Sequence, residues 1–504
     1  MPVLAGCEPE AFWARFEELT RIARPPRHEE PVIEYVRQWG AARGFSASQD
    51  AARNLVFGVP ATPGREGAPI VVLQGHLDMV CERQPGSPND PAEGRIELVV
   101  DGEWLTANGT TLGADDGVAI AAMMAVAEDS SLAHGPLQLL MTVAEEVGLE
   151  GANGLDGTLI HGTILLNLDS EEDGQLTVGS AGSTDSWIRI GEEREPSGRG
   201  AVSLSVGVSG GRGGHSGANI HLGRSNAIKI LGRALRETLA TVPFRLVSFD
   251  GGKSRNAIPR DAGGVCSVAV ELEAEFREAI ESAATTICEA FAKTDPAVRF
   301  TIDRADGETG AWSEAGTARL LDAVALVPTG PLAMSPDFDG LVETSTSLGE
   351  AVTEGDTLTL HSLTRSSNEA ALPEVVAALD AIARLTGGAF EVKRNYGGWR
   401  PDLHSPTLAV ARSVYERLFG EPAAVSAVHA GLEPAVIADK VPGLDMISLG
   451  PQIEAPHSPD ERVNIRTVER FWQLLTGLLD ELSTPTAGAI PTQSLTSRRG
   501  GVAS

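Results

Sequence analysis

Two histidines and three carboxylates of this chain have the chemistry to hold metal ions. They are His76, Asp115, Glu146, Asp169 and His457. Imidazole and carboxylate groups together suit zinc or a similar borderline divalent ion, with manganese or cobalt as alternatives. Two ions that share a bridging carboxylate would each receive one histidine, one further carboxylate and one oxygen of the bridge. Two divalent cations, three carboxylates and a hydroxide also sum to zero charge, which favours burial. The residues therefore predict a pair of Zn²⁺ ions.

The elements that must position these residues are apolar runs, typical of strands buried on both faces of a sheet. The runs are 70–73, 137–143 and 163–168, and they lead to His76, Glu145-Glu146 and Asp169, respectively. In open α/β sheets, ligands bind at the carboxyl ends of the parallel strands. Because all three runs end in a candidate ligand, we expect these ligands to gather at one edge of a sheet.

Two further acids could serve such a site. Asp78 could accept a hydrogen bond from the second ring nitrogen of His76 and fix its tautomer. Glu145 could take the proton of a metal-activated water while Glu146 binds a metal. Each pattern also has a simpler interpretation. His76 and Asp78 could be a solvated histidine and a capping aspartate, and Glu145-Glu146 could be a solvated acidic pair. The repetition at three strand ends favours the metal site.

The composition limits the classes of partner. The 504 residues carry a net charge of −29. An acidic surface repels phosphates, so we expect no nucleic acid partner and no binding to an anionic membrane. The four cysteines form no CxxC pair and the N-terminal residues show no signal-peptide pattern. Both features favour a reducing cytoplasm. No apolar run is long enough for a membrane span.

The pattern of elements predicts an α/β protein of two domains. Apolar strands and an Ala-rich helix alternate up to about residue 182, and a similar pattern resumes at 392–484. Strands and helices of α+β type occupy 183–391. We therefore expect a discontinuous catalytic domain, 1–182 and 392–484, interrupted by a second domain. The Thr-, Ser- and Gly-rich tail, 485–504, is predicted to be disordered.

Several stretches together resemble one family. They include HLDMV, LGADDG, TVAEEVGLEGA, GGHSG, RNAIPR, HAGLEP and PHSPDE, in this order along nearly the whole chain except the tail. The chain resembles the M20 metallopeptidases and, among them, the aminoacyl-histidine (Xaa-His) dipeptidase group. The resemblance implies a zinc-peptidase-like catalytic domain with a central mixed, mostly parallel sheet. It also implies that 183–391 is an inserted α+β lid that mediates dimerisation.

The resemblance assigns roles to the candidate metal ligands. It implies that His76 and Asp169 are terminal ligands of one zinc ion and that Glu146 and His457 are those of the other. Asp115 would be the bridge. The peptide bond from Asp115 to the next residue is expected to be cis. The family often has Asn after the bridging Asp, and Asp116 departs from that pattern.

The resemblance also implies roles for the neighbouring acids and for residues of the lid. Glu145 would be the general base and Asp78 the partner of His76. His215 and Asn256 would contact the substrate, His215 through its oxyanion or carboxylate. Glu433 would hold the substrate amine. The simpler interpretations are a loop histidine among glycines for His215 and a helix cap for Glu433.

The expected activity is metal-dependent hydrolysis of dipeptides. The preferred substrates would be Xaa-His dipeptides, with β-alanyl-histidine as a further candidate. A metal-bridging hydroxide would attack the peptide carbonyl and Glu145 would accept the water proton. Alternatives of the same fold are a non-specific dipeptidase, an aminoacylase or a deacylase. A metal-binding protein without catalysis is an alternative of another class. We also expect a homodimer, as is usual for the family.

Overall fold

The computed structural model describes residues 3–197, 200–305 and 310–484. The tail 485–504, predicted to be disordered, lies outside these residues. The chain forms two compact units. The first comprises Met1–Val178, Leu403–Val425 and Lys440–Ser504, and the second comprises Gly179–Asp402 and Ser426–Asp439. Among the described residues, no helix combines the length and the apolar character needed to cross a bilayer.

The observed units correct the predicted domain bounds at two places. Strand β19 (Ala389–Tyr396) pairs with β9 (Gly182–Gly191), so the second unit extends past residue 391. The segment 426–439 was predicted to be part of the catalytic domain, yet it belongs to the second unit. There the amide of Ala181 donates to the carbonyl oxygen of Ala430, and Ser345 Oγ lies 2.7 Å from His429 Nε2. Such tertiary contacts leave no local pattern in the sequence.

The first unit is built on a mixed sheet of eight strands in the order β1-β2-β6-β3-β7-β21-β8-β20, of which β8 and β20 end beyond the bounds of the unit. The strands are β1 (Ser46–Gln49), β2 (Leu55–Val59), β3 (Val71–His76), β6 (Leu137–Thr142), β7 (Ile164–Asn167), β8 (Gln175–Ser180), β20 (Ala424–Val428) and β21 (Asp445–Ser448). The four central strands, β6, β3, β7 and β21, are parallel to one another. The predicted mixed sheet with a parallel centre is therefore confirmed, and the carboxyl ends of β6, β3 and β7 lie at one edge.

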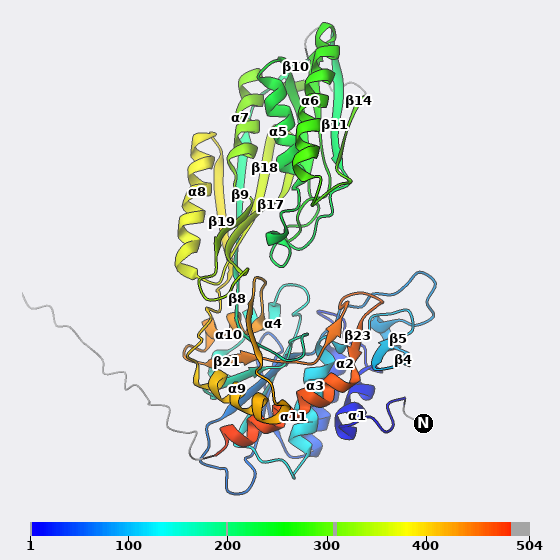
Figure 1. The fold of residues 1–504 in the computed structure, drawn as a ribbon, viewed down its shortest axis with the longest axis vertical. Coiled ribbons are helices and arrows are strands. Elements are labelled where there is room, and N and C mark those ends of the chain that lie inside the picture. The colour runs from blue at the N-terminus through cyan, green and yellow to red at the C-terminus, as the bar shows by residue number, and fades with distance from the viewer. Residues whose placement is uncertain (1–2, 198–199, 306–309, 485–504) are drawn as a thin grey trace, which may run out of the picture. The chain divides into compact units, whose positions relative to one another are not determined.

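The helices of the first unit cover this sheet (Figure 1). They are α1 (Glu10–Leu19), α2 (Glu30–Ala42), α3 (Ala114–Glu128), α4 (Glu150–Asn153), α9 (Pro406–Phe419) and α11 (Ile465–Leu482). Apart from Asp115, Asp116 and Glu128, helix α3 is apolar on all sides, and every residue from Ala114 to Val126 is buried. A side chain at Gly75 would place its Cβ 2.5 Å from the Cβ of Ala119. The glycine therefore lets α3 pack directly against the end of β3.

A small second sheet of the first unit has four strands, in the order β22-β23-β5-β4. They are β4 (Leu98–Asp101), β5 (Trp104–Ala107), β22 (Ile453–Glu454) and β23 (Arg462–Asn464). Strands β4 and β5 pair antiparallel and form a hairpin. It pairs with the segment that surrounds His457, so this sheet fixes both ends of the loop that carries the histidine.

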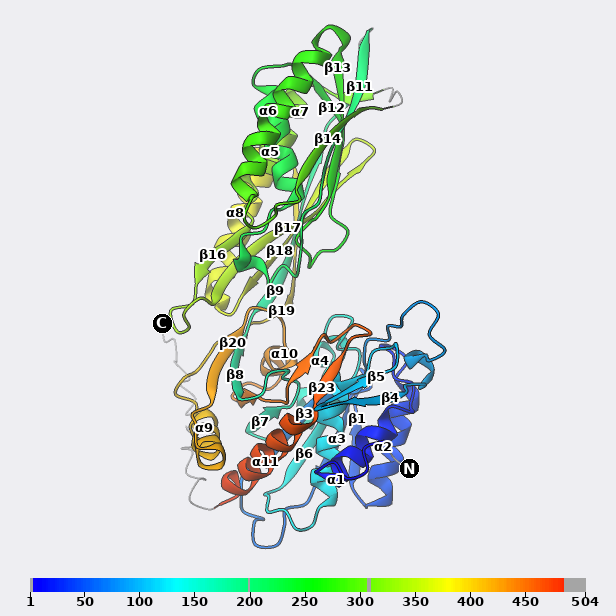
Figure 2. The same ribbon diagram turned by 45° about the vertical axis from the view of Figure 1, so that its right-hand side comes forward.

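The second unit is an antiparallel sheet with helices on one face, which agrees with the expected α+β organisation (Figure 2). Its main path runs β14-β11-β13-β12-β17-β18-β9-β19, and β16 pairs with β17. The strands not yet given are β10 (Arg194–Pro196), β11 (Ala201–Ser209), β12 (Arg245–Gly251), β13 (Ala262–Ala269), β14 (Arg299–Arg304), β15 (Gly310–Trp312), β16 (Gly330–Met334), β17 (Val342–Glu354) and β18 (Thr357–Ser366). The helices are α5 (Ala227–Leu239), α6 (Glu273–Phe291), α7 (Glu314–Leu326) and α8 (Leu372–Leu385). A further helix, α10 (Glu433–Lys440), lies at the end of the segment 426–439. Phe249, Phe276 and Trp312 are fully buried in the core between sheet and helices.

Candidate metal centre

The predicted ligands of the first unit come together at the carboxyl edge of its large sheet. His76 is the last residue of β3, and Glu146 and Asp169 follow β6 and β7. Ligand atoms of Asp115, Glu146 and His457 lie within 4.8 Å of one another. These residues therefore gather at one edge of the sheet, as expected.

Asp115 lies between the two histidines. Its Oδ1 is 3.0 Å from Nε2 of His76, and its Oδ2 is 3.0 Å from Nε2 of His457. The carboxylate thus presents one oxygen to each imidazole, which is the arrangement that a bridging ligand requires. The cis peptide bond expected between Asp115 and Asp116 is present.

Each histidine also has its own carboxylate. Nε2 of His457 lies 3.0 Å from Oε2 of Glu146, and Nε2 of His76 lies 3.7 Å from Oδ1 of Asp169. Among the four predicted terminal ligands, these distances agree with the pairing that the resemblance implied, His76 with Asp169 and His457 with Glu146. The five side chains therefore form two half-sites joined through Asp115.

Asp78 lies near His76, but its carboxylate has other close partners. Nδ1 of His76 is 3.1 Å from the main-chain oxygen of Asp78 and 3.5 Å from its Oδ1. The two carboxylate oxygens accept hydrogen bonds of 3.1 Å from the amides of Glu145 and Glu146. The main-chain oxygen is thus the closer partner of the ring, and the carboxylate fixes the turn that presents the two glutamates.

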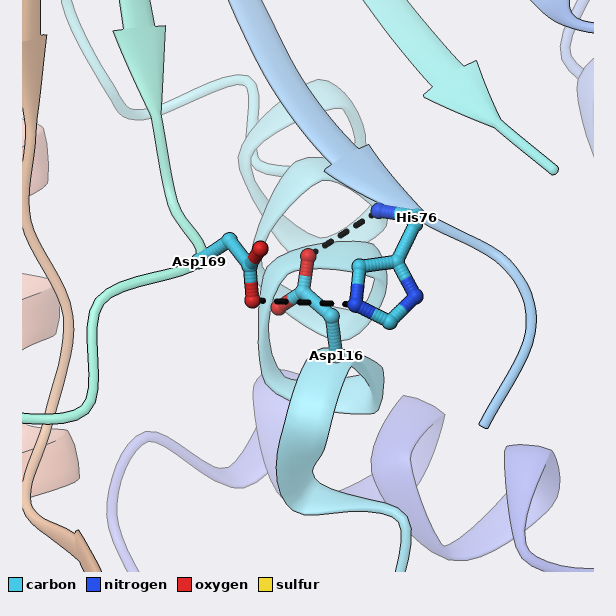
Figure 3. A group of neighbouring side chains, drawn as sticks. All are labelled: His76, Asp116 and Asp169. Carbon is cyan, nitrogen blue, oxygen red and sulfur yellow. Dashed lines mark hydrogen bonds and ion pairs between the residues drawn. The ribbon is translucent and has the colours of Figure 1, made fainter. Parts of the chain in front are cut away.

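Asp116 is a buried carboxylate that was not among the predicted ligands. One oxygen accepts a hydrogen bond of 3.0 Å from the amide of His76, and the other accepts one of 3.3 Å from the amide of Ala119. Figure 3 shows this carboxyl group beside the facing side chains of His76 and Asp169. Asp116 therefore joins the start of α3 to the end of β3, next to the candidate ligands.

The electrostatics of this cluster favour a bound cation. Hydrogen bonds to Asp115 and Glu146 raise the pKa of His457 to about 11. Burial, together with the charge of Asp115, raises the pKa of Glu171 to about 7. The shift of His457 reports a negative potential from the neighbouring carboxylates, and the charge of Asp115 adds to the effect of burial at Glu171. Divalent cations would neutralise this potential and displace the proton from the imidazole, since a metal binds neutral histidine. The donor set therefore fits two divalent metal ions.

The remaining predicted residues, His215, Asn256 and Glu433, belong to the second unit. His215 and the exposed Asn256 both line a cavity of about 600 Å³. Glu433 is fully buried as the first residue of α10. The structure therefore brings two of the three together.

Sequence reasoning missed three buried charged residues near these groups. Arg24 and Glu461 contact the backbone beside the candidate metal ligands, and Arg365 lies 3.2 Å from His215 Nε2. Glu461 stands in the PHSPDE motif, so its position beside His457 was a usable signal. Arg365 offered a weaker one, a charged residue within a strand-like run.

Comparison with known proteins gives the family. The model of peptidase family M20/M25/M40 matches residues 72–481. A cytosol non-specific dipeptidase of Escherichia coli (strain K12) is 36% identical over 482 residues, which are 96% of this chain and 99% of the relative. An aminoacylhistidine dipeptidase from Vibrio alginolyticus is 35% identical, with a TM-score of 0.85, and the match covers 95% of this chain and 98% of that one.

More distant structures share the fold. An aminopeptidase PepT from Bacillus cereus ATCC 10987 is 17% identical, with a TM-score of 0.56, and the match covers 95% of this chain and all of that one (100%). The family model spans most of the chain, and the two nearer relatives match almost all of it. The chain therefore belongs to peptidase family M20/M25/M40 and is a hydrolase that acts on peptide bonds.

Proposed function

We propose that this protein is a dipeptidase that uses two divalent metal ions and works in the cytoplasm. The observation that carries the proposal is the position of Asp115, which offers one carboxylate oxygen to each of two histidines. The printed names of the two nearer relatives, both dipeptidases and one of them cytosolic, support the substrate class and the compartment. Zinc is the expected metal, with manganese or cobalt as alternatives.

The proposed ligand roles follow the distances among the five candidate ligands. His76 and Asp169 would hold one ion, His457 and Glu146 the other, and Asp115 both. When bound, the two ions would activate a water molecule and polarise the peptide carbonyl. Glu145 would take a proton from the attacking water and return it to the leaving nitrogen. Asp78 would keep Glu145 in place, because it binds the amides of Glu145 and Glu146.

We propose that Xaa-His dipeptides are the preferred substrates. The two nearer relatives differ in this respect, since one is named as non-specific and the other as acting on aminoacylhistidine. The decisive experiment is to measure amino acid release from Xaa-His dipeptides, other dipeptides, a tripeptide and acetylated amino acids, with and without a chelator. We expect the zinc-loaded protein to cleave dipeptides only, and the chelator to abolish the reaction.

Other outcomes would replace the proposal. Equal rates on all dipeptides would favour a non-specific dipeptidase over an Xaa-His enzyme. Cleavage of the acetylated compounds alone would identify a deacylase or aminoacylase. Two bound metals without any cleavage would support a non-catalytic metal-binding protein. Gel filtration of the same preparation would test the predicted homodimer.

We further propose that Arg365 and His215 bind the carboxylate of the substrate. Nδ1 of His215 accepts hydrogen bonds from the amides of Gly217 and Ala218, so the proton of the neutral ring is on Nε2. Burial and the charge of Arg365 lower the pKa of His215 to about 4, which keeps the ring neutral near pH 7. Nε2–H and the Arg365 guanidinium are thus two donors only 3.2 Å apart. An anionic acceptor such as a carboxylate fits this pair.

Replacement of Arg365 by Gln should raise KM for dipeptides by about 10- to 100-fold, since a charge-assisted hydrogen bond contributes roughly 1.5–3 kcal/mol. Metal content should not change, because Arg365 is not among the proposed ligands. Steady-state kinetics across dipeptide concentrations would measure the effect. Arg189→Gln, which removes an exposed ion pair with Glu391 in the same unit, is the matched control. An unchanged KM in a folded Arg365→Gln variant would remove Arg365 from the substrate site.

A further inference from the structure

The segment 112–115, which delivers Asp115 to the candidate metal centre, is held from two sides by buried side chains of opposite charge. Glu461 contacts its amides, and Arg24 contacts one of its carbonyl oxygens. Glu461 is 2% exposed and Arg24 is 1% exposed. Neither residue belongs to the ligand set or to the proposed proton transfer, so the metal chemistry gives no direct reason for burying them.

Glu461 binds four consecutive amides. Its Oε2 accepts hydrogen bonds of 2.7 Å and 3.0 Å from the amides of Leu112 and Gly113. Its Oε1 accepts hydrogen bonds of 2.7 Å and 3.3 Å from those of Ala114 and Asp115. One carboxylate thus satisfies the donors of the whole segment, including the amide of the proposed bridging residue itself.

The main chain around Glu461 is fixed independently. The carbonyl oxygen of Glu461 accepts a hydrogen bond of 2.8 Å from Thr106 Oγ1, and β23 begins at the next residue. Strand β23 pairs with β5 in the small sheet. Glu461 also lies four residues after His457, on the same segment. The sheet therefore gives a common support to His457 and to the carboxylate that holds Asp115.

Arg24 contacts the segment and the end of β3 together. Its Nη1 donates to the carbonyl oxygens of Leu77 and Asp78, at 3.1 Å and 3.0 Å, and its Nη2 donates to that of Gly113 at 2.5 Å. A Cβ on Gly113 would lie 2.4 Å from Nη2. The absence of a side chain at Gly113 therefore permits this close approach, which links the His76 side of the site to the Asp115 side.

We propose that Glu461 is a positioning residue for the two-metal centre, and that it sets the place of the Asp115 carboxylate through the four amides of 112–115. The inference rests on the bridging role of Asp115 proposed above. A bridging ligand must satisfy two ions at once, so a shift of the segment would weaken both half-sites together. Hydrogen-bonding partners just outside a metal centre commonly contribute about 10- to 100-fold to metal affinity.

The test is the zinc affinity of a Glu461→Gln variant, measured by competition with a chromophoric chelator. The side-chain amide would turn its NH₂ group toward two backbone amides that now meet a carboxylate oxygen, so donors would face donors. We expect both zinc affinities to fall by about 10- to 100-fold and to fall together. At saturating zinc, kcat should fall while KM for the dipeptide stays near its original value.

Asp445→Asn is the matched control for a purely structural effect. Asp445 accepts hydrogen bonds from Ser405 Oγ and from the amide and hydroxyl of Thr407, at the amino end of β21. This variant should lower the melting temperature of the metal-free protein and leave zinc affinity unchanged. If Glu461→Gln also lowers only the melting temperature and binds two zinc ions with the original affinity, the positioning role is wrong.

A second variant keeps the proposal testable if Glu461→Gln does not fold. Glu461→Asp retains the charge and both acceptors but shortens the side chain by one methylene, so zinc affinity should fall by a smaller factor. If the Glu461→Asp variant binds zinc with the affinity of the unmutated protein, the inference is overturned. Zinc binding is read without any peptide cleavage, so a protein that binds two zinc ions but cleaves no dipeptide would refute the proposed function alone. An unmutated protein that binds fewer than two zinc ions would refute both.

Discussion

Replacement of Glu145 by Gln should lower kcat for dipeptide hydrolysis by about 100- to 10,000-fold, the usual contribution of a positioned general base. A carboxylate oxygen of Glu145 lies within 4.8 Å of the ligand atoms of His76 and Glu146, so it is next to the proposed metals. Gln has the same size but cannot accept the proton of the attacking water. Metal content should remain at two ions per chain. Elemental analysis would measure the metal content, and initial rates of dipeptide hydrolysis would measure kcat.

The prediction for Glu145 has a control variant and two results that would contradict it. Glu150→Gln removes an exposed carboxylate five residues further along, which pairs with Arg27, and should leave kcat unchanged. More than a tenth of the original kcat in Glu145→Gln would rule out the general-base role. Loss of a metal ion would instead make Glu145 a ligand, an alternative raised by its closeness to His76 and Glu146.

Replacement of Asp115 by Asn should reduce bound metal below two ions per chain and lower kcat by more than about 1,000-fold, since the metals contribute several kcal/mol to transition-state stabilisation. Asn offers one oxygen where Asp115 now offers one to each histidine. The second ion would face an amide NH₂ group in place of a carboxylate oxygen. Metal content after gel filtration and the rate on an Xaa-His dipeptide would measure the two effects.

Exposed Asp101→Asn, at the end of β4, carries the same chemical change away from the cluster and should keep both ions and full activity. Chelator-treated unmutated protein gives the rate without metal. An Asp115→Asn variant that retains two ions at the original affinity would show that another residue bridges them. Asp116 would then be the first candidate, because it lies in a group with His76 and Asp169.

Much of the first unit could be predicted from sequence because its strands are buried on both faces. All six residues of β3 and all six of β6 are buried, and the strands contain the apolar stretches 71–73 and 139–141, which are easy to recognise. Their carboxyl ends then coincide because the two strands pair in parallel. His76, Glu146 and Asp169 could be grouped for the same reason, since each follows an apolar run.

Features that depend on long-range contacts could not be predicted. The segment 426–439 joins the second unit through partners such as Ser345, which is 84 residues from His429. The amide contacts of Glu461 join residues 346 to 349 positions apart. Asp78 was predicted to contact the ring of His76, and its Oδ1 lies 3.5 Å from Nδ1, but its closer contacts with the amides of Glu145 and Glu146 were not predicted. No local periodicity records which of several nearby donors a side chain will meet.

The contact between Asp115 and His457 joins residues 342 positions apart. A ribosome makes the chain from its amino end, so His76, Asp115 and Asp169 emerge long before His457. Only one half of the centre can exist during that interval, and the whole inserted unit must be synthesised before the other half arrives. With the proposed ligand roles, a chain that lacks His457 would have no complete pair of half-sites in which to retain two ions. Binding of the second ion, and with it peptide hydrolysis, would then begin only after His457 has been synthesised and the loop that carries it has folded against Asp115.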